Sequence, residues 1–215
     1  MDIIPGLKKR WGKQAWIGLL LVIVFLMIGM NARFFSLPSS LAESGPGQAV
    51  SLIKKLGMVA LPRIPPPADF DLAGLDGRNV RLSGQKGKVV LLNFWTTWCP
   101  SCRIEMPDLE KLHQALQGRP FILLAVDLRE SPETVRSYFD KNNLGFTALL
   151  DRDGDVAHRF GVRSIPTTFL IDQEGAIIGK AVGSRPWGSS KAVALIEHLI
   201  ANPLSSQGGP VKESE

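Results

Sequence analysis

Two cysteines, Cys99 and Cys102, are the only ones in this chain of 215 residues, and two residues separate them. A structural disulfide stabilises a fold chiefly by closing a long loop of the unfolded chain, and a bridge at this spacing would close almost none. The same spacing suits disulfide exchange, in which a thiolate attacks a disulfide and a second nearby thiol resolves the mixed disulfide. The spacing of the pair therefore indicates redox chemistry rather than a structural disulfide.

A metal half-site and two inert core cysteines are the alternatives for this pair. A closed zinc site needs four ligands, and the only histidines that could complete one are His113, His158 and His198. They are scattered along the chain without the paired spacing of a zinc site. We therefore expect no metal and no cofactor, and the two alternatives stay open at this point.

The segments around the pair favour a reactive Cys99. An apolar run over residues 89–95 precedes it and predicts a strand buried on both faces. Pro100 suits the first position of a helix, so Cys99 would lie at the helix N-terminus, where free N–H groups and the helix dipole favour negative charge. Such sites lower the pKa of a cysteine from about 8.5 to about 3.5–7.5. Cys102, one turn later and deeper, is then expected to resolve the mixed disulfide.

The remaining pattern predicts an α/β domain over residues 68–203, with a mixed central sheet flanked by helices. Residues 69–72 and 80–82 are expected to form an N-terminal hairpin extension. The other expected strands cover residues 121–126, 148–150, 167–171 and 176–180, and the expected helices cover 100–118, a segment from Pro132, 156–160 and 190–201.

Residues 15–30 carry no charge and predict a membrane-spanning helix. A helix of this length spans about 24 Å, against a hydrocarbon core of about 30 Å, so interfacial flanks extend the expected signal-anchor to residues 15–35. The basic side chains Lys8, Lys9, Arg10 and Lys13 would keep residues 1–14 in the cytoplasm and send the domain across the membrane. A cleaved signal peptide and a buried core helix are the alternatives, although Ser40–Ala42 lies far downstream for a cleavage site.

Residues 36–67 are rich in proline, glycine and serine and are expected to form a semi-rigid tether. Residues 49–59 within them could form a short amphipathic helix, and residues 204–215 are expected to be a disordered tail.

The net charge is +5, but residues 1–35 hold five basic residues against Asp2 alone, which leaves 20 basic and 19 acidic residues elsewhere. A nucleic-acid binder carries its basic excess on the folded domain, so we expect no nucleic-acid partner.

Two segments resemble the signatures of a known family. Residues 94–107, FWTTWCPSCRIEMP, resemble the active-site segment of membrane-anchored thioredoxin-like proteins of the TlpA/ResA type and are similar to that of their cytochrome c maturation relatives. Residues 162–172, VRSIPTTFLID, resemble the second signature, and the match covers residues 65–200. The resemblance implies a thioredoxin-like fold and a thiol–disulfide oxidoreductase whose domain lies on the periplasmic, extracytoplasmic side of the bacterial inner membrane.

The resemblance also implies a substrate-binding surface. It implies that Pro166 is in the cis form beside the disulfide, where the backbone of Ile165 can pair with a substrate strand. An ordinary trans turn is the alternative. Trp98 and Pro100 are expected to contact the substrate as well. Trp95 and Trp98 are expected to wall the site, and plain packing is the alternative for either tryptophan.

One departure from the thioredoxin pattern concerns the buried acid. Many thioredoxins carry a buried aspartate on the central strand, and here the matching residue is Asn93, which cannot titrate. Glu105, one turn beyond Cys102, matches an acidic residue that ResA-like proteins use near their cysteines. The resemblance therefore implies proton transfer or pKa tuning by Glu105, and a solvated glutamate on the helix surface is the alternative.

The implied partners are protein thiol or disulfide substrates and a membrane electron donor. The implied reaction is reduction of a specific protein, such as apocytochrome c or a copper-site protein of the respiratory chain. A copper chaperone of the same fold would bind metal through Cys99, Cys102 and His158, but its family spaces the cysteines one residue further apart. A peroxiredoxin-type peroxidase needs Pro-x-x-x-Thr-x-x-Cys, and Leu92 occupies the proline position.

Overall fold

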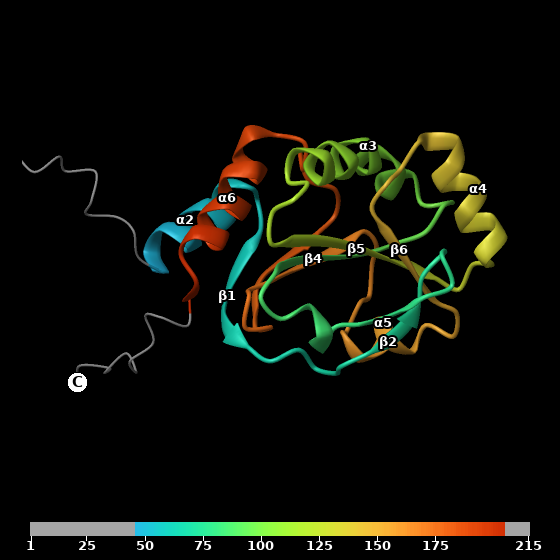
Figure 1. Cartoon of the computed structure of the whole chain (residues 1–215), viewed down its shortest axis with the longest axis horizontal. Helices are drawn as coiled ribbons and strands as arrows, with labels where there is room; N and C mark the ends of the chain where they lie inside the picture. The colour runs from blue at the N-terminus through green and yellow to red at the C-terminus, as the bar shows by residue number, and fades with distance from the viewer. Residues whose placement is uncertain (1–45, 205–215) are drawn as a thin grey trace, which may run out of the picture. The chain divides into compact units, whose positions relative to one another are not determined.

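A computed structural model describes residues 46–204, which form a six-stranded mixed sheet with helices on both faces and a separate two-stranded hairpin (Figure 1). The strand order is β1-β8-β7-β4-β5-β6. Strands β4, β5 and β6 are parallel, whereas β7 is antiparallel to β4, and β8 is antiparallel to β7 and β1. The elements are α2 (Pro46–Lys55), β1 (Val59–Ile64), β2 (Asp71–Ala73), β3 (Asn79–Arg81), the 3-10 turn η2 (Ser83–Gln85), β4 (Val89–Trp95), α3 (Pro100–Ala115), β5 (Phe121–Leu128), α4 (Pro132–Asn142), β6 (Thr147–Asp151), α5 (Asp155–Arg159), β7 (Thr167–Ile171), β8 (Ile177–Val182) and α6 (Ser190–Ala201).

Strand β4 lies between two apolar cores, which explains why its sequence is a continuous apolar run. Leu91 and Trp95 join the core beneath α2, α3, α4 and α6. Leu92 and Phe94 point to the opposite face and join the core beneath the hairpin and α5. Figure 1 shows α3 and α4 over one face of the sheet, with β2 and α5 over the other. The strand is therefore fixed on both sides, and so is the point where it ends.

The predicted mixed α/β architecture is confirmed, with element ends that shift by a few residues. The predicted hairpin is present as the antiparallel pair β2–β3. The Oγ atom of Ser131 accepts the N–H of Thr134 at 3.2 Å and caps α4, the helix predicted to begin at Pro132. Helix α6 has the predicted bounds, and Ser189 caps it in the same way.

The predicted tether over residues 36–67 is wrong for residues 46–64, which belong to the folded domain. Ala49 and Ile53 of α2 are buried in the core shared with α6. Strand β1 pairs with the edge of the sheet, with Val59 opposite Lys180. The strand contains Pro62 and a register irregularity, features that sheets tolerate at an edge and that hide a strand pattern in the sequence.

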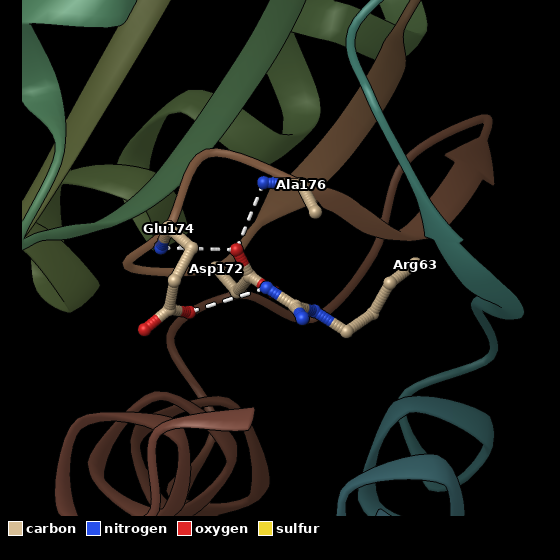
Figure 2. Close-up of polar contacts among 4 residues, drawn as sticks. All are labelled: Arg63, Asp172, Glu174 and Ala176. Carbon is tan, nitrogen blue, oxygen red and sulfur yellow. Dashed lines mark hydrogen bonds and ion pairs between the residues drawn. The ribbon is translucent and has the colours of Figure 1, made fainter. Parts of the chain in front are cut away.

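The side chain of Arg63 links β1 to the turn between β7 and β8 (Figure 2). Its Nε donates to Oδ2 of Asp172 at 2.6 Å, and its Nη2 lies 3.4 Å from Oε2 of Glu174. The Asp172 carboxylate is only 3% exposed and also accepts the backbone N–H groups of Glu174 and Ala176 at 3.1 and 2.8 Å. A buried carboxylate requires such partners. This cluster therefore fixes the position of β1 on the sheet.

Residues 1–45 and 205–215 lie outside the described residues. The predictions that fall there are the cytoplasmic segment 1–14, the membrane segment 15–35, the first part of the tether and the C-terminal tail. None of the helices within residues 46–204 has the length and apolar character needed to cross a membrane.

Candidate active site

Cys99 and Cys102 form a disulfide at the N-terminus of α3, with Cα atoms 5.3 Å apart. The strand before them ends at Trp95 and the helix begins at Pro100, so Cys99 is the N-cap residue. Its Sγ accepts the N–H of Cys102 at 3.2 Å, the contact that stabilises negative charge at a helix N-terminus. Cys99 is 4% exposed, whereas Cys102 is fully buried. The geometry therefore makes Cys99 the outer sulfur of the pair.

The loop that precedes β7 faces Cys99. The Ile165–Pro166 peptide bond is cis, as the resemblance implied. The Ile165 carbonyl oxygen lies 3.8 Å from Sγ of Cys99, and the Oγ of Ser101 lies 3.4 Å from the same sulfur. The N–H of Gly183 donates to the Pro166 carbonyl at 2.8 Å, which ties this loop to the end of β8. The two segments that carried the resemblance thus meet at the outer sulfur.

The two tryptophans near the cysteines have different environments. Trp98 is 68% exposed, and Ile104 on the first turns of α3 is 73% exposed, so the segment that carries the disulfide presents two large apolar side chains to solvent. Pro100 is exposed beside them. Trp95 is fully buried and its ring lies 5.3 Å from that of Tyr138, which makes it part of the core. Of the two, only Trp98 is available to a substrate.

Glu105 is buried, and the alternative of a solvated surface glutamate is therefore wrong. The side chain is 1% exposed. Oε1 accepts Nδ2 of Asn93 at 2.9 Å, and Oε2 accepts Nε1 of Trp187 at 2.9 Å and the backbone N–H of Arg185 at 3.2 Å. Desolvation by burial raises the pKa of Glu105 to about 7, and these three hydrogen bonds oppose the rise. The carboxyl therefore titrates close to neutral pH.

Asn93 explains how this chain departs from the thioredoxin pattern. Its Nδ2 donates both to Glu105 and to Oγ1 of Thr168, each at 2.9 Å. The strand supplies a neutral amide, and the buried carboxyl comes from helix α3 instead. Sequence reasoning missed Thr168 and Trp187, which lie 75 and 82 residues from their partners and carry no local signal of the contact.

A second buried acid was also missed. Asp127 is fully buried at the end of β5, directly beside Trp95 in the parallel register. Burial and, next, the neighbouring Glu130 carboxyl raise the pKa of Asp127 to about 8. The two oxygens of Glu130 accept the backbone N–H and the hydroxyl of Thr97, both at 2.6 Å. Glu130 thus holds the loop that leads to Cys99, and Oδ1 of Asp127 accepts the N–H of Glu130 at 3.1 Å.

A groove of about 460 Å³ lies beside the disulfide. Trp98 and Ile165 line it, and these are the residues that flank Cys99 in sequence and in space. Its other lining side chains include the basic residues Arg129, His158 and Arg163. A polypeptide that reaches the outer sulfur over Trp98 and Ile165 would therefore lie along this groove.

Comparison with known proteins places this site in a family. Residues 65–180 match the AhpC/TSA family. A segment of 117 residues is 33% identical to the thiol-disulfide oxidoreductase ResA of Bacillus thuringiensis subsp. konkukian and covers 54% of this chain and 68% of that protein. The chain belongs to the AhpC/TSA family and is of the ResA type. The match to ResA of Geobacillus thermodenitrificans is 40% identical over 109 residues but spans 63% of that protein, less than two thirds of its length, and 51% of this chain.

A solved structure confirms the fold of this ResA-type chain. A thiol:disulfide interchange protein of the thioredoxin family from Chlorobium tepidum superposes with a TM-score of 0.56 at 26% identity, over 66% of this chain and 99% of that one. The predicted thioredoxin-like α/β fold is thereby confirmed. The named relatives are thiol–disulfide oxidoreductases, which agrees with the predicted enzyme class.

Proposed function

We propose that this ResA-type protein is an extracytoplasmic oxidoreductase that reduces disulfides in specific proteins through the Cys99–Cys102 couple. The position of the Cys99 sulfur carries the proposal. It accepts the N–H of Cys102 at the head of α3, and it lies 3.8 Å from the carbonyl of Ile165. The first contact favours a thiolate, and the second marks an edge of backbone with which an extended substrate can pair.

The reaction begins from the reduced pair. The Cys99 thiolate attacks one sulfur of a substrate disulfide, so that this bond breaks, a mixed disulfide forms and the second substrate sulfur leaves as a thiolate. The Cys102 thiol then loses its proton and attacks Sγ of Cys99. The mixed disulfide breaks, the first substrate sulfur leaves, and the Cys99–Cys102 disulfide forms. Two electrons have passed to the substrate, and a membrane electron donor returns them to the protein.

Glu105 accepts the proton of Cys102 in this scheme. The two residues are three positions apart on α3, a spacing that places side chains on one helix face, and both are buried. A carboxyl with a pKa of about 7 can take up and release a proton at neutral pH. Because bulk water reaches neither group readily, a local acceptor makes Cys102 reactive when the mixed disulfide forms.

The location and the substrates belong to the same proposal. Residues 15–35 would anchor the protein in the bacterial inner membrane with the domain on the outer side, and the substrates would be cysteines of apocytochrome c or of a respiratory copper-site protein. The full chain should remain in the membrane fraction after an alkaline carbonate wash, whereas a chain without residues 15–35 should be released. If the wash released the full chain as well as the shortened chain, residues 15–35 would not be a membrane anchor.

Two serine variants test the roles of the cysteines. With Cys102→Ser, the mixed disulfide on Cys99 cannot be resolved, so partner proteins should accumulate as adducts that reductant releases. Cys99→Ser is the matched control and should trap few or none, because Cys102 is buried. Adducts should be counted by non-reducing electrophoresis and mass spectrometry of membranes from the native host. Equal trapping by both variants, or none by either, would contradict the assigned roles.

A further inference from the structure

The groove beside Cys99 contains an arginine whose position the backbone fixes. We propose that Arg129 binds a carboxylate of the substrate polypeptide, an Asp or Glu side chain close to the cysteine that Cys99 attacks. This assignment rests on the proposed function, because it names the substrate chemistry of the same site. Arg129, Trp98 and Ile165 line one groove, so a chain that reaches the Cys99 sulfur along this groove passes Arg129.

The backbone of Arg129 has a conformation that arginine rarely adopts. Its φ is +65°, in the left-handed region, where few residues other than glycine, asparagine and aspartate are found. Its N–H donates to the carbonyl of Asp151 at 3.1 Å, which fixes the residue where β5 and β6 end. Conformations of this kind persist where the surrounding structure holds them, and they cluster at ligand sites.

The side chain of Arg129 is fixed as well. Its Nε donates to the carbonyl of Asp153 at 3.0 Å. A Cβ atom on Gly154 would lie 2.5 Å from this Nε and 2.8 Å from Nη2, so the guanidinium packs closely against the backbone of Gly154. Gly154 itself has a φ of +81°. Two neighbouring residues thus have the unusual features needed to hold one guanidinium in place.

The terminal nitrogens of the Arg129 guanidinium remain available as hydrogen-bond donors. Within residues 46–204 its terminal Nη1 and Nη2 atoms make no hydrogen bond or ion pair, and only Nε is used. A guanidinium binds a carboxylate through two parallel N–H groups, a geometry that a lysine cannot reproduce. Because the structure has already ordered the side chain, binding would cost little further conformational entropy.

The charge of the groove favours an acidic partner. Arg129 and Arg163 line it, and Arg163 makes no hydrogen bond or ion pair with the described part of the chain. Glu130 is the one acidic residue among the lining side chains, and both of its oxygens already accept hydrogen bonds from Thr97. Excess positive charge near the sulfur would steer a segment that carries an acid toward Cys99.

The test compares disulfide peptides that differ only in one residue. Each peptide carries either Glu or its neutral isostere Gln at one position, one to four residues on either side of the reactive cysteine. With the reduced full chain, we expect kcat/KM to be about tenfold higher for Glu than for Gln at one or more positions, as a charged hydrogen-bonded pair would give. The preference should shrink at 0.5 M salt, because salt screens a pair in an open groove.

Arg129→Asn is the variant of choice, because asparagine tolerates a positive φ and so preserves the loop. It should reduce the Glu/Gln ratio of kcat/KM to about one. Arg81→Gln, on the hairpin and outside the groove, is the matched control and should keep the full ratio. A ratio near one at every position in the wild type, or an unchanged ratio in Arg129→Asn, would overturn the proposal. Failure to reduce any peptide would instead refute the proposed function.

Discussion

Replacing Glu105 by glutamine should change how the stability of the protein depends on pH. Burial raises the pKa of Glu105 from 4.5 to about 7. A raised pKa in the folded state means that the stability associated with this group is full below pH 4.5 and is lost as the pH rises through 7. At about 1.4 kcal/mol per pKa unit, the ionised carboxylate costs the folded protein about 3 kcal/mol at pH 8.5.

The assay is urea unfolding of the oxidised wild type and of Glu105→Gln at a series of pH values from 4.5 to 8.5. The difference in free energy of unfolding, variant minus wild type, should rise by about 3 kcal/mol across this range, because glutamine never ionises. Asp127 also has a raised pKa, but it is present in both proteins, so its contribution cancels in the difference. Glu110→Gln is the control, because Glu110 lies on the same helix but is only half-buried, with its carboxylate hydrogen-bonded to Gln114 and Gly145.

A difference between wild type and Glu105→Gln that stays constant within about 0.5 kcal/mol would refute the reasoning. It would mean that the hydrogen bonds from Asn93, Trp187 and Arg185 stabilise the carboxylate as fully as water does. A rise of the same size in Glu110→Gln would show that the effect does not come from burial.

Two further substitutions test the contacts described above. Arg63→Gln should lower the free energy of unfolding, measured in urea, by about 1–2 kcal/mol, because it leaves Asp172 without its cation; this lies between the values for exposed and buried ion pairs. Arg81→Gln, which breaks an exposed ion pair with Asp71, should lower it by less than about 0.5 kcal/mol. Trp187→Phe removes a hydrogen-bond donor to Glu105, so the pH at which stability falls should move above 7, and the protein should lose about 1–3 kcal/mol at pH 8.5 in the same pH series. An unmoved midpoint would show that Nε1 does not act on the carboxyl.

The sequence predicted those parts of the fold whose signals are local. The run from Val89 to Trp95 is almost entirely apolar because β4 is buried on both faces, and α6 was predicted with the bounds that the structure shows. Strand β1 was missed because it is an edge strand, contains Pro62 and is defined by pairing with β8, which lies more than one hundred residues later. No local pattern contains that pairing.

The same distinction between local and long-range signals applies to the candidate site. The cysteines were placed correctly because strand, Cys-x-x-Cys and helix follow one another in sequence, and the cis peptide before Pro166 followed from the family resemblance. The burial of Glu105 depends on Trp187, and the fixed position of Arg129 depends on Gly154. These contacts join residues that are distant or have no characteristic spacing, so only the folded structure reveals them.

A redox titration of the Cys99–Cys102 pair tests the central claim most directly. The full chain is equilibrated with a range of ratios of reduced to oxidised dithiothreitol, quenched with acid and alkylated, and the adducts are weighed by mass spectrometry. The two cysteines should gain label together in one two-electron transition, and the reduced protein should return to the disulfide when a disulfide peptide is added. A pair that resists reduction at every ratio, or a reduced protein that the peptide does not oxidise, would contradict the account.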